Sequence, residues 1–237
     1  MSSSALAIGQ VVIHSRENLD CVQRNELFCP GWAIDNLDRY VDPTVQHVGL
    51  VVTSVILGFA IAFGLAILAH RVHWLQPPLL AGTGILYTVP SIAFFFLLLP
   101  ITGRGRDTAI IALTAYTLQI IFRNILVGLH NVPAHTKDAG RGMGLTDWQL
   151  LWRVELPLAL PEIIAGLRIA TVSTVAIATL AVFAGGGGLG DPIYKDITFK
   201  TNIIIAGGIA ILMAVTFDAM LLGIQRFATP WRRAATG

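Results

Sequence analysis

The stretch VGLVVTSVILGFAIAFGLAILA, residues 48–69, decides the fold class of this chain. It contains no charged residue, and its polar interruptions are Thr53 and Ser54. A helix of this length, rising 1.5 Å per residue, crosses the roughly 30 Å hydrocarbon core of a bilayer. A buried helix of a soluble all-α protein normally keeps a polar face toward water. This run has no such face, so it predicts a transmembrane helix rather than a soluble core helix.

The composition of the whole chain agrees with a membrane protein. Of its 237 residues, 54% are hydrophobic and 13% are charged, and the mean hydropathy is +0.70. Soluble domains carry about 25% charged residues, so these values argue against a water-soluble fold. The formal net charge of +2 is too small to indicate a nucleic-acid partner. Residues 1–12 lack the basic start and the apolar stretch of a secretory signal, so membrane insertion is expected to begin at residue 48.

Four further apolar runs are long enough to span a bilayer, which makes five in all. They cover residues 79–99, 108–129, 161–184 and 202–227. The first of these four contains Pro90, which is expected to bend it. Each run can satisfy its backbone hydrogen bonds within its own helix, as the hydrocarbon requires. The predicted fold class is therefore an all-α membrane protein with five transmembrane helices.

Basic residues beside the spans predict the orientation of the chain in the membrane. With five spans, the C-terminal tail at 228–237 and the connection at 131–160 lie on one side, which we assign to the cytoplasm. The tail at 1–47 then lies outside the cytoplasm, and residues 48–227 form the membrane domain. The basic residues on the predicted cytoplasmic side are Arg71, Lys137, Arg141, Arg153, Arg226, Arg232 and Arg233, against Arg104, Arg106, Lys195 and Lys200 in the loops of the other side.

The two cysteines, Cys21 and Cys29, both precede the first span. On the predicted external side they meet an oxidising environment, in which a disulfide can persist. Such a bridge would close a short loop and hold an otherwise loose tail. Two free thiols are the alternative, because bonding depends on geometry that the spacing does not fix.

The segment NVPAHTKDAGRGMGLTDWQLLWRVELPLALPE, residues 131–162, is too polar to cross a membrane. Thr136 and Thr146 are predicted to cap two short helices, because threonine accepts hydrogen bonds from the free N–H groups of a first turn. Between them, Gly144 predicts a turn. The segment is therefore expected to form a helical hairpin on the cytoplasmic side.

The second helix of this hairpin is expected to end at Pro157 and Pro161, where the fourth span begins. Its aromatic and aliphatic side chains, including Trp148, cannot all be buried by so small a unit, which indicates a protein partner at the cytoplasmic surface. The membrane surface is the alternative, but interfacial helices carry more Lys and Arg than this segment has.

The hairpin resembles the E-A-A…G…I-x-L-P signature of ABC importer permeases. The letters DAG at 138–140, G at 144 and VELP at 154–157 keep the spacing of that signature. Asp replaces Glu, Gly replaces the second Ala and Val replaces Ile. In the family, these residues form coupling helices that dock into a groove on the ATPase subunits. The resemblance assigns ATPase coupling to Asp138, Ala139, Gly140, Gly144, Leu145, Trp148, Val154, Leu156 and Pro157.

The resemblance continues along residues 48–227 and is specific to the osmoprotectant group. IIFRNILVGLHNVP (120–133), GMGLTDWQLLWRVELPLALPEIIAGLR (142–168) and ATLAVFAGGGGLGDPI (178–193) look like glycine betaine, carnitine and choline permeases. YTVPSIA (87–93) is similar to their second span, with a tyrosine where glutamine is common. The N-terminal tail lies outside the resemblance.

By resemblance, the chain has the type I ABC importer permease fold and imports a compatible solute by alternating access. The expected solute is glycine betaine, choline, carnitine or proline betaine. Another small solute, such as an amino acid or a thiol-containing betaine, stays open because the family selects substrates largely through its binding protein. The expected partners are a second permease chain, identical or paralogous, two ATPase subunits that bind ATP and Mg, and an external solute-binding protein.

No enzyme activity, cofactor or metal site is expected in the chain itself. The six histidines show no metal-ligand spacing, and the spans hold no nucleophile with a base and an orienting group. A membrane enzyme would need such a set. A scaffold that does not transport is the remaining alternative, and the absence of an ATPase partner would favour it.

Polar residues inside the spans are candidates for the pathway or its inner gate. Arg123, with Asn124 beside it, and Arg168 lie near the predicted cytoplasmic ends of their helices, where snorkelling to the interface is the alternative. Asp218 lies deeper, about 12 Å from the boundary at Arg226. It is expected to pair with Arg168 or Arg123, or to meet a quaternary ammonium group.

Two conspicuous runs receive structural interpretations. GGGGLG, residues 185–190, is not followed by the Lys-Ser or Lys-Thr of a P-loop, so it is expected to be a flexible hinge that caps the fourth span. The three phenylalanines at 94–96 point in different directions on a helix. Packing and lipid contact therefore explain them better than an aromatic cage for a methylated ammonium.

Overall fold

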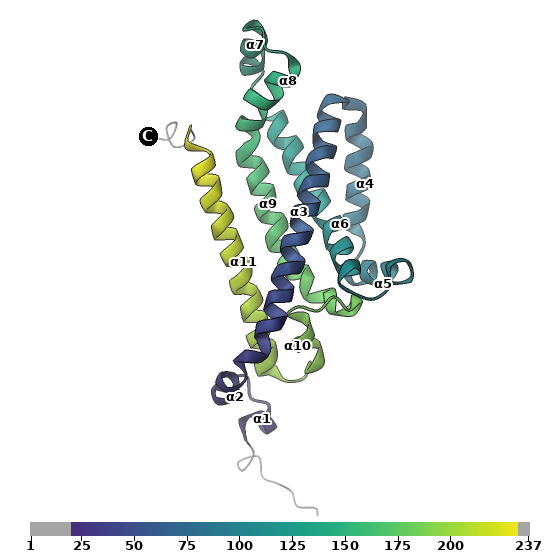
Figure 1. The fold of residues 1–237 in the computed structure, drawn as a ribbon, viewed down its shortest axis with the longest axis vertical. Helices are drawn as coiled ribbons and strands as arrows, with labels where there is room; N and C mark the ends of the chain where they lie inside the picture. Colours follow the sequence, from purple (N-terminus) through teal and green to yellow (C-terminus); the bar gives the residue numbers. More distant parts are fainter. Residues whose placement is uncertain (1–19, 232–237) are drawn as a thin grey trace, which may run out of the picture.

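The computed structural model describes residues 20–231, and every regular element in that part of the chain is helical. The elements are α1 (Cys21–Arg24), α2 (Pro30–Asp35), η2 (Leu37–Tyr40), α3 (Val41–Arg71), η3 (His73–Leu75), α4 (Gln76–Thr88), α5 (Ser91–Thr102), α6 (Arg106–His130), α7 (Ala134–Gly142), α8 (Asp147–Leu150), the π-helical turn η4 (Leu151–Glu155), α9 (Leu156–Ala178), η5 (Thr179–Ala184), α10 (Gly190–Lys195) and α11 (Lys200–Ala228). The long helices form one elongated bundle (Figure 1).

The two ends of this bundle hold different elements. Helices α7 and α8 lie at one end, which we call the hairpin end, and α11 ends on the same side (Figure 1). Helices α1, α2 and α10 lie at the other end, which we call the clasp end (Figure 1). The described N-terminal and C-terminal elements therefore lie at opposite ends, as an odd number of spans requires.

Four helical runs are long and apolar enough to cross a membrane, namely Leu37–Arg71, Arg106–His130, Asp147–Ala184 and Lys200–Ala228. The remaining predicted span forms a bent pair, His73–Thr88 and Ser91–Thr102, whose halves meet at 98°. Counted as one span, the pair completes the five predicted from the sequence.

The bend in this pair falls at Pro90, as predicted, but it is a break rather than a curve. Helix α4 runs beside the bundle and α5 turns sideways from it (Figure 1). Pro90 has no N–H to continue α4, and Val89 before it is extended, with φ −66° and ψ 128°. The freed Val89 carbonyl accepts a hydrogen bond from the Tyr116 hydroxyl, and Phe94 N–H donates to the Pro90 carbonyl at 2.9 Å. These two bonds satisfy the carbonyls of both residues at the break, as the hydrocarbon interior requires.

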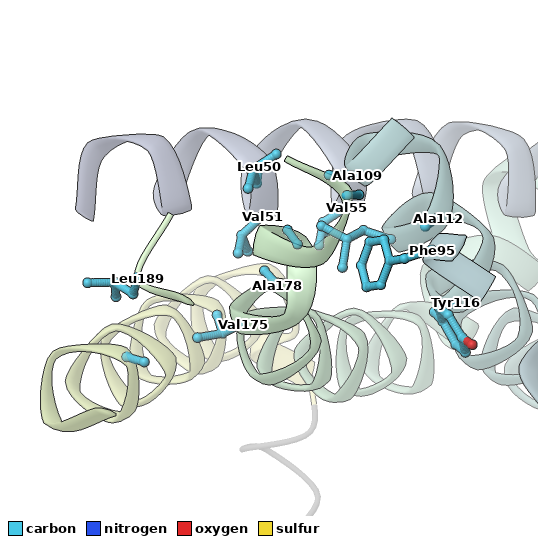
Figure 2. Close-up of a cluster of buried hydrophobic side chains, with 14 of the residues drawn as sticks. Leu50, Val51, Val55, Phe95, Ala109, Ala112, Tyr116, Val175, Ala178 and Leu189 are labelled. Atoms are coloured by element: carbon cyan, nitrogen blue, oxygen red, sulfur yellow. The ribbon is translucent and has the colours of Figure 1, made fainter. Parts of the chain in front are cut away.

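Small and aliphatic side chains fill the core between α3, α6 and α9. Figure 2 shows side chains of these helices turned toward one another, with the Phe95 ring among them. Phe94 and Phe95 are buried in this cluster and Phe96 is exposed, so packing explains the run as predicted. A second cluster continues the core toward the hairpin end, around Ile121, Phe122 and Ile125.

Helix α6 lies in close contact with both of its long neighbours. A Cβ at Gly58 of α3 would meet Thr117 Oγ1 at 1.7 Å, and a Cβ at Gly166 of α9 would meet Asn124 Cβ at 2.3 Å. Transmembrane helices associate through such close packing, because lipid leaves little hydrophobic driving force between them. Asn124, a predicted pathway residue, thus lies at the α6–α9 contact.

The prediction that Pro157 and Pro161 end the second hairpin helix is wrong. Residues 147–184 form one continuous helical run, in which η4 widens the backbone just before Pro157. The Leu156 N–H bonds to the Leu151 carbonyl, five residues back. This π-turn changes the hydrogen-bond register where a proline ring would otherwise meet the preceding turn of an α-helix.

Two other helix boundaries differ from the sequence prediction. Helix α7 begins at Ala134 after Pro133, so Thr136 lies inside it and is not its N-cap. Proline suits a helix start because its φ is already near the helical value. Helix α3 begins at Val41 rather than at residue 48, with Pro43 in its first turn.

The segment at 20–40, which we call the N-terminal clasp, is docked on the bundle rather than loose. Cys21 and Cys29 are joined in a disulfide, with their Cα atoms 5.8 Å apart. The Cys29 N–H donates to Thr201 Oγ1 at 3.0 Å in a buried contact. Other contacts of the clasp with the α10–α11 region include Asn25 Nδ2 to the Thr198 carbonyl at 2.7 Å, Lys200 N–H to Asn25 Oδ1 at 3.1 Å, the Tyr40 hydroxyl to Asn202 Oδ1, and an edge-on ring contact of Trp32 with Phe199.

The glycine run at 185–190 is tightly packed, which corrects the prediction of a flexible hinge. A Cβ at Gly190 would lie 1.8 Å from the Thr179 carbonyl oxygen, and one at Gly187 would lie 2.2 Å from Gln46 Oε1. The Leu189 N–H donates to His47 Nδ1 at 3.2 Å. The run caps the fourth span as predicted, but glycine is required there for close approach.

Candidate functional site

The hairpin turn is built by three backbone hydrogen bonds at the end of α7. The Met143 N–H donates to the Ala139 carbonyl at 3.0 Å, the Gly144 N–H to the Arg141 carbonyl at 2.9 Å, and the Leu145 N–H to the Gly140 carbonyl at 3.2 Å. This is a Schellman motif, which satisfies the last carbonyls of a helix. Gly144 has φ +80°, a value that favours glycine, so the predicted turn lies where the sequence placed it.

A capping box starts α8 directly after this turn. The Gln149 N–H donates to Thr146 Oγ1 at 3.3 Å, and the Thr146 N–H donates to Gln149 Oε1 at 3.0 Å. The predicted cap at Thr146 is confirmed. Together, the Schellman motif and the capping box fix the angle between α7 and α8 through local bonds.

The predicted coupling residues divide into an exposed and an internal group. Asp138, Ala139, Gly144 and Trp148 are exposed, Leu145, Val154 and Pro157 are partly buried, and Gly140 and Leu156 are buried. A Cβ at Gly140 would lie 2.6 Å from Leu150 Cδ1, so the glycine that replaces the family's second alanine lets α7 pack closely on α8. The exposed members face outward, where a partner can reach them.

The tip of the hairpin presents a large apolar surface. Met143 is 76% exposed, Trp148 55% and Trp152 46%. The two tryptophan rings are in edge contact at 5.6 Å, and the Arg71 guanidinium lies 5.0 Å from the Trp148 ring. Exposed clusters of this kind mark protein-binding or membrane-binding surfaces.

Sequence reasoning missed a buried polar cluster at the base of the hairpin. Glu155 Oε2 lies 2.6 Å from His70 Nε2, and Glu155 Oε1 lies 3.5 Å from Lys137 Nζ. The Glu155 side chain is only 6% exposed. A carboxylate between apolar residues of a helix start, VELPL, was the available signal, but its partners are far away in the sequence.

Arg168 and Asp218 form a two-point ion pair between α9 and α11. Arg168 Nε donates to Asp218 Oδ1 and Arg168 Nη2 to Asp218 Oδ2, both at 2.8 Å. The predicted pairing of Asp218 with Arg168 is confirmed. Arg168 lies about three turns into α9 and its guanidinium is held by Asp218, while its snorkelling to the membrane interface stays a prediction.

The ion pair is accessible from the surface of the isolated chain. The Arg168 side chain is 26% exposed and the Asp218 side chain 36%. Two hollows, of about 490 and 450 Å³, meet at Asp218 and Val172. Arg123, the other predicted pathway cation, is exposed on α6 and does not join this pair. Within residues 20–231, no group of three His, Cys, Asp or Glu side chains could hold a metal ion.

A family model described as binding-protein-dependent transport system inner membrane component matches residues 49–233. The chain belongs to this family. Its members are permeases, transport components rather than enzymes, and the family's transport system implies an ATPase and a substrate-binding protein as partners. The permease is therefore a multi-pass protein of the inner membrane.

Curated relatives of the permease include transport proteins for osmoprotectants. A carnitine transport permease protein of Listeria monocytogenes is 36% identical over 79% of this chain and 87% of its own length. An osmoprotectant import permease protein of Salmonella typhimurium is 36% identical over 84% of this chain and 96% of its own. A glycine betaine/carnitine/choline transport system permease protein of Bacillus subtilis is 34% identical over 79% of this chain and 87% of its own length.

Solved structures with the same fold include ABC transporters. An inward-facing methionine ABC transporter covers 83% of the permease and 98% of its own chain, with a TM-score of 0.71 and 22% identity. An amino acid ABC transporter covers 81% of the permease and 95% of its own chain, with a TM-score of 0.69 and 16% identity. These similarities confirm the predicted type I importer permease fold.

Proposed function

We propose that this permease forms, with a second permease chain, the pathway of an ATP-driven importer for a compatible solute with a quaternary ammonium group. Relatives at 34–36% identity are named for carnitine, for osmoprotectants, and for glycine betaine, carnitine and choline. The solved structures named for methionine and amino acids share only 16–22% identity and support the fold alone. An amino acid is therefore the less favoured cargo, and none of these three relatives is named for a thiol-containing betaine.

One observation carries the coupling role in this proposal. An apolar bundle ends in a hairpin whose turn is locked by local hydrogen bonds and whose tip exposes Met143, Trp148 and Trp152. A lipid-surface helix would need more basic residues opposite these side chains. The hairpin therefore suits a groove on an ATPase subunit, which would bind ATP and Mg and hydrolyse the nucleotide.

The Arg168–Asp218 pair supports a pathway between two permease chains. Lipid is a poor environment for a charged pair that is about a third exposed in the middle of two spans. Water or protein must cover this side of α9 and α11. By contrast, the groove of about 370 Å³ between α3 and α11 is lined by apolar residues such as Phe59, Phe217 and Met220, and it suits acyl chains or an apolar helix.

The orientation in this proposal puts the hairpin end in the cytoplasm and the clasp end outside. The excess of basic residues near the hairpin supports it. The disulfide also suits this orientation, because disulfides persist outside the cytoplasm. Residues 1–47 then precede the membrane domain at 48–227, and 228–237 form a cytoplasmic tail.

Uptake of radiolabelled solutes tests the proposal. Cells that contain the ATPase and the binding protein, with or without this permease, would receive glycine betaine, choline, carnitine or methionine after osmotic upshift. We expect uptake of at least one quaternary ammonium solute that requires ATP and this chain, and no uptake of methionine. Equal uptake with and without the permease would refute the transport function, and uptake of methionine alone would refute the substrate class.

Charge variants test the pathway role of Arg168 and Asp218. Asp218→Asn leaves the Arg168 guanidinium without its counter-charge, so we expect uptake to fall at least about tenfold. The double exchange Arg168→Asp with Asp218→Arg restores a pair and should restore assembly. Normal uptake by Asp218→Asn, with normal assembly, would exclude a pathway role for this pair.

A further inference from the structure

We infer that Glu155 is a positioning residue that joins the hairpin to α3, so that the two move as one unit during transport. The inference rests on the proposed function, in which an ATPase subunit moves the hairpin. It adds to that function the residue that receives the movement, Glu155, and the span that transmits it, α3. Neither His70 nor Glu155 belongs to the signature residues of the hairpin.

The Glu155 carboxylate connects four elements in one buried cluster. Oε2 contacts His70 Nε2 on the last turn of α3 at 2.6 Å, and Oε1 contacts Lys137 Nζ on α7 at 3.5 Å. Lys137 Nζ also donates to the Leu129 carbonyl near the end of α6 at 3.2 Å. Glu155 itself is the last residue of the π-turn that leads into α9.

The chemistry of this cluster makes it a stiffer joint than the apolar contacts around it. Hydrogen bonds to a carboxylate are short and directional, whereas apolar surfaces tolerate sliding. Breaking the contact with His70 would leave a carboxylate that is 6% exposed with only its 3.5 Å contact to Lys137, which is a poorly compensated buried charge. Displacement of the hairpin should therefore carry α3 with it, rather than break the contact with His70.

Two aromatic contacts place the same part of α3 against the hairpin. The Arg71 guanidinium lies 5.0 Å from the Trp148 ring, and the Phe63 ring lies 6.2 Å from the Trp152 ring. These contacts come from the last turns of α3, as the His70 contact does. They hold the orientation of the hairpin while the polar contact fixes its register.

Helix α3 also contacts the glycine run at the clasp end. The Leu189 N–H donates to His47 Nδ1 at 3.2 Å, and the Gly188 N–H donates to Gln46 Oε1 at 3.2 Å. His47 Nε2 lies 3.0 Å from the Val175 carbonyl of α9. A helix of 31 residues thus connects the Glu155 joint with the loop that caps the fourth span. This gives the hairpin a continuous path across the membrane.

A distance measurement between the hairpin and α3 tests the joint directly. Spin labels would be placed at Gly142→Cys, where a Cβ has open space, and at exposed Leu68→Cys, in the permease assembled with its ATPase. Cys21 and Cys29 are bonded and do not react with the label. With Glu155 intact, we expect one narrow distance that is the same with and without ATP. A distance that shifts between these states would overturn the inference.

The variant Glu155→Gln keeps the size of the side chain and removes its charge. We expect a broader distance distribution even without nucleotide, and about tenfold less solute imported per ATP hydrolysed, as allosteric coupling energies produce. Lys195→Gln is the matched control, because its ion pair with Asp191 lies on the surface of α10 at the clasp end, away from the hairpin, and it should leave both readouts unchanged. A narrow distance and a normal import ratio in Glu155→Gln would exclude the joint.

A second variant keeps the test decisive if Glu155→Gln does not fold. His70→Gln leaves Glu155 paired with Lys137 and should give a smaller effect in the same direction. Where both variants fold, the double variant should be no worse than Glu155→Gln alone, because the two residues act in one contact. If the unchanged permease imports nothing, the proposed function fails, while the label distance without nucleotide still reports on the joint.

Discussion

The two ends of this permease are built in opposite ways. The clasp end is held by a disulfide, by buried side-chain bonds such as Cys29 N–H to Thr201 Oγ1, and by a glycine run whose atoms lie in tight contact with α3. The hairpin end has a locally locked turn, one buried polar cluster at its base and a tip with two exposed tryptophans.

This difference assigns different tasks to the two ends. Many long-range bonds at the clasp end stabilise one arrangement of α3, α10 and α11. At the hairpin end, local bonds keep the shape of the hairpin while its apolar tip stays open for a partner. Changes at the clasp end should therefore affect folding first, and changes at the hairpin end should affect coupling first.

Gly190→Ala should have the largest effect, because its Cβ would lie 1.8 Å from the Thr179 carbonyl oxygen, a backbone atom that cannot rotate away. We expect almost no monodisperse protein after detergent extraction, measured by fluorescence size-exclusion chromatography. Gly207→Ala is the control, since its Cβ has open space. A normal yield of Gly190→Ala would contradict the prediction that the clasp end depends on close packing.

Gly144→Val should abolish coupling without preventing folding. A β-branched residue at φ +80° is strained by roughly 1–2 kcal/mol and disturbs the Schellman motif that orients α8. We expect uptake to fall at least about tenfold, in the range of allosteric coupling effects, while the amount of permease in the membrane stays normal.

The matched control for this variant is Gly142→Val, two residues earlier. Gly142 lies in α7 without a positive φ, and a Cβ there meets no atom within 4 Å. Its uptake should stay near that of the unchanged permease. If uptake fell equally in both variants, the loss would come from the change of the hairpin surface and not from the change of its turn.

Trp148→Ala should weaken the complex with the ATPase. Removal of a tryptophan from the centre of an interface costs about 2 kcal/mol of binding free energy, which raises the dissociation constant roughly 30-fold. Binding of the purified ATPase to the permease in nanodiscs would measure the change. Ile34→Ala removes an exposed apolar side chain at the clasp end and should leave this affinity unchanged. Unchanged binding by Trp148→Ala would place the ATPase contact elsewhere.

The double variant Cys21→Ser with Cys29→Ser should have the smallest effect on uptake, less than about twofold. Loss of the short cross-linked loop destabilises the clasp by about 2–3 kcal/mol. The bonds of Asn25 and Tyr40 to the α10–α11 region remain. Limited proteolysis of the outer segment should accelerate while the bundle stays intact. Loss of the folded bundle would show that the disulfide is required for the membrane domain itself.

The hairpin was the part of the candidate site best predicted from sequence. The turn at Gly144 and the cap at Thr146 depend on neighbouring residues only, so their geometry follows from local chemistry. The prediction failed at Thr136 and Pro157, where a neighbouring proline and a π-turn altered the helix boundaries. The pairing of Asp218 with Arg168 was among the predicted alternatives, but no local pattern favoured it over a pairing with Arg123.

By itself, the sequence determined that the chain is a helical membrane protein with a polar hairpin between its third and fourth spans. Long apolar runs and local turn signals are one-dimensional properties, and the bilayer converts them directly into spanning helices. Only the tertiary structure decided which distant residues meet. His70 and Glu155 are 85 residues apart and Asn25 and Thr198 are 173 apart, and such contacts depend on how the helices pack, which no local pattern encodes.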